Sequence, residues 1–215
     1  MNIPGHIYFE LISLLASITL FFRKGIPLYL RLFAPYLLIT LIVEIGAWRM
    51  DKEGKDASLL LFHFTVLEFV FYFYVFYNII RTAAARKVIF SLLFIYPILS
   101  LINIYFIQVK AFPSTTYSLG CLLTVGICIY YFYELFHLPS SVNLLREPAF
   151  WLCTGLMFYY ICSFPLFGLY SLLYSTSNII MKNISTILMV MNALLYTLFT
   201  VAFLCGTRVR KLHYK

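Results

Sequence analysis

Seven long apolar stretches follow one another along the chain, and they constrain its fold more than any other feature. A helix rises 1.5 Å per residue, so roughly 20 apolar residues cross the hydrocarbon core of a bilayer. The stretches predict transmembrane helices at about residues 6–25, 27–48, 58–81, 87–109, 114–138, 148–172 and 183–206. We therefore expect an all-α fold, a polytopic membrane bundle of seven transmembrane helices that forms a single domain over residues 1–215.

The composition and the punctuation between the stretches agree with this prediction. Hydrophobic residues make up 63% of the chain and charged residues 11%, and the mean hydropathy is +0.92, far from the values of a soluble domain. The connecting segments are too short to fold alone, which excludes a separate kinase, nuclease or binding domain. Pro27, Pro113 and Pro148 lie where helices should begin, and Ser58 is placed to cap the third helix. The first apolar run contains Glu10 and follows no basic residue, so we expect a retained helix rather than a cleaved signal peptide.

Lysine and arginine are distributed unequally between the two predicted sides of the membrane. Five lie on one side, namely Arg49, Lys52, Lys55, Lys110 and Lys182. Eleven lie on the other, namely Arg23, Lys24, Arg31, Arg81, Arg86, Lys87, Arg146, Arg208, Arg210, Lys211 and Lys215. The positive-inside rule then predicts an N-terminus outside and a cytoplasmic C-terminus. Membrane lipids are expected partners of these juxtamembrane cations, so the net charge of +8 needs no nucleic acid to explain it.

Four of the eight acidic residues fall inside predicted helices, where they need partners. An unpaired charge at the centre of a membrane helix costs at least about 2.5–3.5 kcal/mol. Glu10, Glu44 and Glu68 are predicted in the outer half of the bundle or at its midplane. Glu134 stands apart at the inner end of the fifth helix, where Arg146 or another cation on the cytoplasmic side is its candidate partner.

Helical spacing places other polar groups on the same faces as these acids. Asn103 and Asn192 mark polar faces on the fourth and seventh helices. His63 lies five residues before Glu68, about 140° around the helix, so it should face a different neighbour. The remaining members are Ser13 and Ser17 with Glu10, Tyr36 and Thr40 with Glu44, and Thr65 and Tyr72 with Glu68.

Such polar faces have two interpretations. Small polar groups often join helices to one another, at about 0.6 kcal/mol per contact. Three carboxyl groups are a costly way to join helices, so they favour a cavity open to the outside that binds a cation, protons or a small polar ligand. The predicted ligand- or ion-binding residues are Glu10, Glu44, His63, Glu68, Asn103 and Asn192.

A divalent cation is one version of this ligand and the only cofactor that the residues suggest. His6 and Glu10 are four residues apart on one helical face, and three further side chains supply nitrogen and oxygen ligands. The last apolar stretch contains no lysine for retinal, and only one histidine is deep enough for haem, so neither cofactor is expected. The sequence contains no catalytic motif, so an enzyme is expected only through such a metal. The candidate ligands are His6, Glu10, Glu44, His63 and Glu68.

The stretch YYFYELFHLPSSVNLLREPAFWLCTGLMFYY occupies residues 130–160. It resembles a pattern in standalone seven-helix membrane proteins of Bacteroidota, some of which are encoded beside small histidine kinases. The resemblance implies a sensor or accessory protein of the bacterial cytoplasmic (inner) membrane. It transfers no catalytic residues, and it implies that a protein partner carries any output.

Three function classes are consistent with these observations. A receptor-like module binds its ligand in the outer cavity and signals through a protein partner; the alternatives are a small secondary transporter or ion channel and a metal-dependent membrane enzyme. After Glu68 the chain reads FVFYFYVFY over residues 69–77, which predicts an aromatic plug and favours the receptor. The predicted contacts with the partner are Arg81, Arg86, Lys87, Arg208, Arg210 and Lys211.

Overall fold

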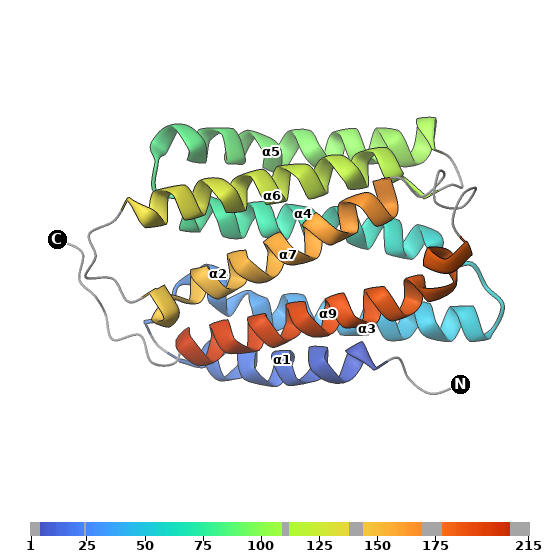
Figure 1. The fold of residues 1–215 in the computed structure, drawn as a ribbon, viewed down its shortest axis with the longest axis horizontal. Coiled ribbons are helices and arrows are strands. Elements are labelled where there is room, and N and C mark those ends of the chain that lie inside the picture. The colour runs from blue at the N-terminus through green and yellow to red at the C-terminus, as the bar shows by residue number, and fades with distance from the viewer. Residues whose placement is uncertain (1–4, 24, 109–111, 138–143, 169–177, 207–215) are drawn as a thin grey trace.

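The computed structural model describes residues 5–23, 25–108, 112–137, 144–168 and 178–206, with the side chains of the last range from residue 183 onward. The regular secondary structure of these ranges is all helical (Figure 1). The helices are α1 (His6–Phe21), α2 (Leu28–Arg31), α3 (Phe33–Lys52), α4 (Ser58–Ile79), α5 (Ala83–Ile102), η1 (Asn103–Ile107), α6 (Ser114–Phe136), η2 (Leu144–Arg146), α7 (Pro148–Gly168) and α9 (Asn178–Gly206).

Six of these helical segments are long and apolar enough to cross a membrane, as expected for a multi-pass membrane protein. α2 and α3 count as one of them, Leu28–Lys52, and η1 extends α5 as far as Ile107. The first predicted span is shorter than the other six, because α1 ends at Phe21 and has only 16 residues. The seven-helix arrangement therefore contains six long helices and one shorter apolar helix.

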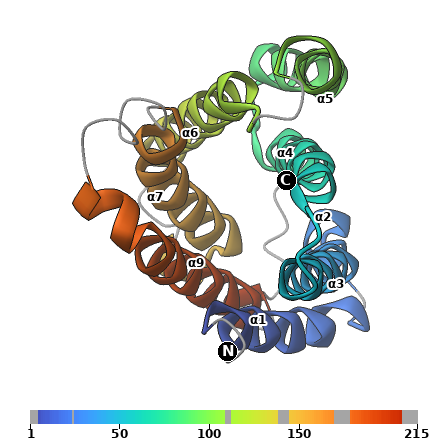
Figure 2. The ribbon, with the colours of Figure 1, turned by 90° about the vertical axis from the view of Figure 1, so that its right-hand side faces the viewer.

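The helices run alternately up and down the long axis of the bundle (Figure 1). In the end-on view, α7 lies between α6 and α9, α1 lies between α9 and α3, and α4 lies beside α5 (Figure 2). The end where α1 begins and α3 finishes is called the His6 end. The opposite end, where α4 finishes and α5 begins, is called the Arg81 end.

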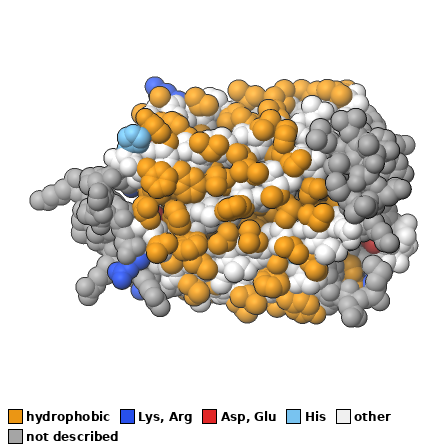
Figure 3. Space-filling model, viewed as in Figure 1, with side chains coloured by type: hydrophobic (Ala, Val, Ile, Leu, Met, Phe, Trp, Pro, Cys, Tyr) orange, Lys and Arg blue, Asp and Glu red, His pale blue; other side chains and the backbone are white. Residues whose placement is uncertain are grey.

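The outer surface of the bundle is apolar. Hydrophobic side chains cover the middle of the face in Figure 3, while lysine and arginine side chains lie toward the ends. Large exposed hydrophobic residues include Ile42, Phe94, Ile129, Phe158 and Leu204. This distribution suits a surface in contact with lipid tails.

The centre of the bundle is closed by aromatic side chains, which we call the aromatic plug. It comprises six fully enclosed residues from α3, α4 and α9: Phe33, Phe69, Phe73, Phe76, Phe199 and Phe203. The ring of Phe33 lies 5.4 Å from that of Phe199 and 5.3 Å from that of Phe203, measured between centroids. The predicted burial of aromatic residues directly after Glu68 is therefore confirmed.

Gly120 on α6 is needed beside this plug. A Cβ atom at this position would lie 2.6 Å from the ring of Phe69 and 2.7 Å from the hydroxyl of Tyr96. Only glycine therefore allows α4, α5 and α6 to meet so closely.

The predicted helix starts are mostly correct. α2 follows Pro27, α6 follows Pro113, and Pro148 is the first residue of α7. The prediction that Ser58 caps the third span is wrong, because Ser58 is itself the first residue of α4. Its backbone N–H donates to Asp56 Oδ1 at 2.8 Å, and hydrogen bonding to Ser58 lowers the pKa of Asp56.

Candidate functional site

Three helices bring the carboxyl groups of Glu10, Glu44 and Glu68 together in the His6 half of the bundle. Glu10 lies on α1, Glu44 on α3 and Glu68 on α4. Glu10 is close enough to the other two for like-charge repulsion to act on it, and Glu44 also repels Glu68. We call this group the carboxylate cluster. It unites three of the side chains that helical spacing singled out.

Glu10 is the least compensated member of the cluster. The residue is completely enclosed, and neither of its carboxyl oxygens makes a hydrogen bond within the described part of the chain. The Glu44 carboxyl lies close enough to Glu10 for the two groups to share a proton. Ser13, on the next turn of α1, is also enclosed, and its hydroxyl is likewise without a partner among the described residues. Positive charge is what this position lacks.

Glu44 has one basic partner at the mouth of the cluster. His6 Nε2 lies 3.0 Å from Glu44 Oε2, and the two side chains are 20% and 22% exposed. The contact joins the first turn of α1 to the second half of α3. His6 therefore stands between the carboxylate cluster and the end of the bundle.

Glu68 is the inner member of the cluster and is half-buried. The hydroxyl of Tyr72 donates to Glu68 Oε1 at 3.3 Å, and the hydroxyl of Tyr36 donates to that of Tyr72 at 3.0 Å. The enclosed hydroxyl of Tyr160 faces the same carboxylate and stabilises its charge, although its contacts with the described residues are too loose for a well-formed hydrogen bond. The aromatic plug begins at the next residue, Phe69, and Tyr72, whose hydroxyl is hydrogen-bonded to that of Tyr36, lies one helical turn further along α4.

His63 faces away from the cluster, as its angular offset from Glu68 predicts. Its side chain is exposed; Nδ1 lies 2.7 Å from the carbonyl oxygen of Leu59 and Nε2 lies 2.7 Å from the hydroxyl of Tyr105 in η1. The five predicted metal ligands therefore do not all come together, because His63 points to η1 while His6 contacts Glu44. The described residues contain no group of three or more His, Cys, Asp or Glu side chains suited to a metal ion.

The two predicted asparagines lie on other elements. Asn103 is enclosed in η1, and its Nδ2 donates to Gln108 Oε1 at 2.8 Å and to Thr116 Oγ1 at 3.0 Å. This side chain joins η1 to the first turn of α6, which is the interhelical role that the alternative interpretation assigns to small polar groups. Asn192 is half-buried on α9.

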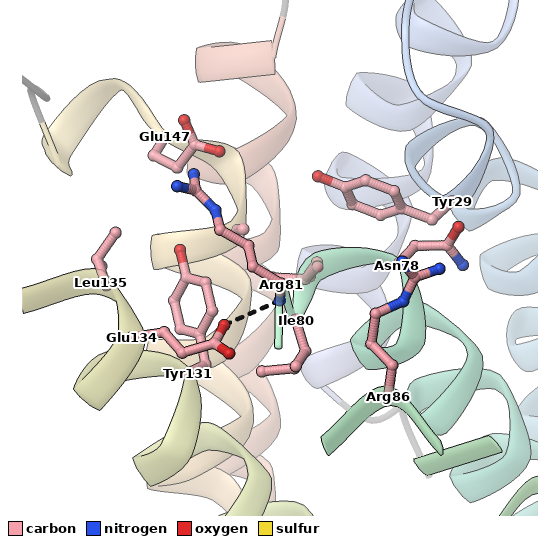
Figure 4. A pocket seen from close by; sticks show the side chains of 11 residues that line it. Tyr29, Asn78, Ile80, Arg81, Arg86, Tyr131, Glu134, Leu135 and Glu147 are labelled. Atoms are coloured by element: carbon pink, nitrogen blue, oxygen red, sulfur yellow. Dashed lines mark hydrogen bonds between the residues drawn. The ribbon is translucent and has the colours of Figure 1, made fainter. Parts of the chain in front are cut away.

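A second polar site, at the Arg81 end, was not predicted as a cavity. It has a volume of about 460 Å³ and lies among α2, α4, α5, α6 and the start of α7 (Figure 4). In the sequence these residues are loop cations or isolated acids, because the pattern does not show that α2, α6, the α4–α5 connection and the start of α7 converge. The side chains that line it are those of Tyr29, Asn78, Ile79, Ile80, Arg81, Arg86, Tyr131, Glu134, Leu135, Glu147 and Ala149.

Glu134 binds the start of α5 rather than Arg146. Its two carboxyl oxygens accept the backbone N–H groups of Arg81 and Thr82, each at 2.9 Å. Thr82 is the N-cap residue of α5, so the carboxylate satisfies donors that the helix leaves without intrahelical partners. The prediction named Arg146 or another cation on the same side as the partner. The charge of Arg81 does act on Glu134, but the hydrogen bonds come from backbone N–H groups at a helix start, which the side-chain pattern does not reveal.

Glu147 precedes α7 and faces the same cavity. Burial raises the pKa of Glu147, and the positive charge of Arg81 acts in the opposite direction. Figure 4 shows the Arg81 guanidinium group next to the Glu147 carboxylate. The contact links the α4–α5 connection to the start of α7.

The predicted partner contacts divide between described and undescribed residues. Arg81 and Lys87 are exposed at the Arg81 end, and Arg86 is half-buried with its guanidinium carbon 4.6 Å from the centroid of the Tyr77 ring. The tail residues Arg208, Arg210 and Lys211 lie outside the described residues.

No family model matches this chain, and neither a curated protein nor a solved structure matches it. The chemistry of the two polar sites is therefore the basis on which a function can be inferred.

Proposed function

We propose that the protein is a receptor-like membrane sensor whose carboxylate cluster takes up positive charge, as a proton or as a small cationic ligand. The observation that carries this proposal is the complete enclosure of Glu10 with neither oxygen hydrogen-bonded among the described residues, beside Glu44 and Glu68. An ionised carboxylate costs several kcal/mol in such surroundings unless it is paired. Uptake of positive charge removes that cost and the mutual repulsion together.

The response to the ligand is transmitted by the helices that carry the cluster. α1 packs against both α3 and α9, so a change at Glu10 reaches two neighbours. α4 runs without interruption for 22 residues from Ser58 to Ile79, past Glu68 and on to the Arg81 end. A protein partner that contacts Arg81, Arg86 and Lys87 there would register a shift of α4. This proposal agrees with the resemblance to membrane proteins encoded beside histidine kinases.

The aromatic plug favours the receptor over the transporter. A transported ion has to pass from the carboxylate cluster to the Arg81 end, and the six phenylalanines of the plug are fully enclosed between the two. Reconstitution into proteoliposomes separates the two functions. Cation or proton flux that disappears in Glu68→Gln would support the transporter, whereas ligand-dependent stabilisation without flux would support the receptor.

The orientation belongs to the same proposal. We place the N-terminus and the carboxylate cluster outside, the C-terminus in the cytoplasm and the protein in a bacterial inner membrane, with α1 as the seventh span. The count of lysine and arginine supports this orientation. A reporter fused after Lys215 should read cytoplasmic and one inserted near Gly54 should read external. The reverse pattern in both would overturn the assignment.

Thermal unfolding of the purified protein tests the sensor directly. Curves are recorded from pH 5 to pH 8, with and without divalent cations, for wild type and Glu68→Gln. We expect the variant to fold but to lose the stabilisation that depends on pH or cation. Glu68→Leu should also lose stability, because the Tyr72 hydroxyl then has no acceptor.

Glu53→Gln is the matched control for this experiment. Glu53 lies at the same end of the bundle, is exposed, and pairs with Lys55. Its variant should reproduce the wild-type response. Superimposable curves for wild type and Glu68→Gln under every condition would mean that Glu68 only joins helices.

A further inference from the structure

Arg86 lies between two hollows at the Arg81 end. One is the polar cavity of about 460 Å³ that Glu134 and Glu147 line. The other is a groove of about 500 Å³ along the first half of α5, lined by Tyr77, Ala83, Arg86, Lys87, Phe90 and Ser91. We propose that the two hollows together bind one phospholipid with an anionic headgroup, whose phosphate lies at Arg86, whose headgroup extends into the cavity and whose acyl chain follows the groove.

The charges around the cavity leave Arg86 as the cation that a ligand can neutralise. Both oxygens of Glu134 are taken by backbone N–H groups, and Glu147 lies beside Arg81. Arg86 Nε is enclosed and has no hydrogen-bond partner among the described residues. Its guanidinium group lies over the Tyr77 ring, a cation–π contact that positions the group and leaves its N–H donors for an oxyanion.

Tyr131 supplies a second, independent reason to expect a polar ligand. The residue is only 5% exposed, its hydroxyl has no hydrogen-bond partner within the described chain, and it lines the same cavity. Figure 4 shows Tyr131 and Arg86 on opposite sides of the chain at Ile80 and Arg81. A ligand that reaches both must be extended, as a phosphate with a polar headgroup beyond it would be.

The groove distinguishes a lipid from a soluble phosphate. The rings of Tyr77 and Phe90 lie 5.8 Å apart, and Phe90 and Phe94 continue the aromatic wall along α5 at 5.2 Å. Lys87 adds a second positive charge at the polar mouth of this groove. Aromatic walls with cations at one end are complementary to an acyl chain below an anionic headgroup, and basic pockets between membrane helices bind such headgroups.

This inference does not depend on the carboxylate cluster. Arg86 and Tyr131 lie at the Arg81 end, on the far side of the aromatic plug, so their variants should leave the response of Glu68 to pH and cations unchanged. A failure of the lipid site and a failure of the sensor are therefore separate results.

The test measures lipid binding to the delipidated full chain in detergent. Native mass spectrometry records occupancy during titration with dioleoylphosphatidylglycerol, with dioleoylphosphatidylcholine as the zwitterionic comparison, and with inorganic phosphate. We expect Arg86→Gln to weaken phosphatidylglycerol binding about tenfold or more, since it removes a charge-assisted hydrogen bond. Tyr131→Phe, which removes one oxygen, should weaken it by roughly threefold to tenfold.

Two further variants locate the ligand. Ala83→Phe fills the groove without changing its charge. It should weaken the binding of phosphatidylglycerol and leave the binding of inorganic phosphate unchanged. Arg49→Gln removes an exposed cation at the His6 end and should bind lipid as wild type does. Equal lipid affinity in wild type, Arg86→Gln and Tyr131→Phe would overturn the site. Saturation by inorganic phosphate that abolishes the preference for phosphatidylglycerol would overturn the assignment to a lipid.

Discussion

The two ends of the bundle treat carboxyl groups on their helices differently. At the Arg81 end, Glu134 accepts two backbone N–H groups, and the charge of Arg81 offsets part of the burial cost of Glu147. In the His6 half, Glu10 has no hydrogen bond among the described residues, and the charged groups near it are other carboxylates. A carboxylate that is compensated in the folded chain stabilises the fold, whereas one that is not compensated leaves binding energy for a ligand. The same residue type therefore has opposite effects at the two ends.

The largest expected effect comes from removing the acceptor at the Arg81 end. Glu134→Ala leaves the N–H groups of Arg81 and Thr82 without their carboxylate, and we expect a loss of about 2 kcal/mol in the free energy of unfolding. Thermal unfolding in detergent measures it, with Glu53→Ala as an exposed control that should change stability by less than about 1 kcal/mol. A wild-type melting temperature in Glu134→Ala would show that the two ends do not differ.

Neutralising Glu10 should stabilise the protein, whereas Glu134→Ala should destabilise it. Glu10→Gln fixes a neutral side chain at this position, so at pH 8, where ionisation of the cluster is furthest advanced in the tested range, we expect it to stabilise the protein by at most about 1 kcal/mol, less any cost of the enclosed amide. At pH 5 the gain should shrink, because protonation of the cluster already relieves repulsion in wild type. The same unfolding assay at the two pH values checks this. A loss at pH 8 as large as that of Glu134→Ala would refute the contrast.

Glu147 should give a smaller, pH-dependent effect. Its pKa is raised by burial, so the folded state binds its proton more tightly than the unfolded state does. The stabilisation is complete below the unfolded pKa and is lost as the pH rises through the folded pKa. Because the group is partly exposed, we expect less than about 1 kcal/mol. Glu147→Gln should abolish this loss of stability with rising pH. The measurement is the difference between the wild-type and Glu147→Gln curves of unfolding free energy above pH 4. Arg81→Gln should make the loss larger than in wild type.

The smallest effect is expected at His63. Its side chain is exposed and bonded to Tyr105, so His63→Gln should change stability by less than about 0.5 kcal/mol. It should also leave the pH and cation response of the cluster intact, which repeating the Glu68 experiment in this variant would show. A lost response would place His63 functionally with Glu10 after all and would restore the metal prediction.

Most of the helical architecture can be predicted from the sequence, because length and hydropathy determine which segments can cross a bilayer. The ends of helices are harder to predict. The second predicted span is interrupted at Leu32 between α2 and α3, and the fourth ends in the wider turns of η1 at Asn103. Local hydrogen bonds determine where a helix is interrupted or changes its turn. The apolar pattern continues unchanged across these points, so it does not reveal them.

A candidate site could be predicted where its residues form a pattern within single helices, and could not be predicted where it depends on contacts between distant segments. Helical spacing placed Glu10, Glu44 and Glu68 on faces that could meet, and the 140° offset separated His63 from Glu68. The cavity at the Arg81 end depends on backbone N–H groups and on the convergence of distant connections, and neither leaves a pattern in the side-chain sequence. The hydrogen bond from the Thr82 backbone N–H to Glu134, which joins residues 52 positions apart, is an example.

The short length of α1 has a consequence for the membrane around the protein. Its 16 residues span about 24 Å, whereas a typical hydrocarbon core is about 30 Å thick. A bilayer that accommodates α1 as a span therefore thins beside it, at a cost of a fraction of a kcal/mol per Å. Thinning brings headgroups and water toward Glu10 on that same helix. Bilayer thickness then becomes a variable that sets how readily ions reach the carboxylate cluster, so lipids of different chain length should shift its response.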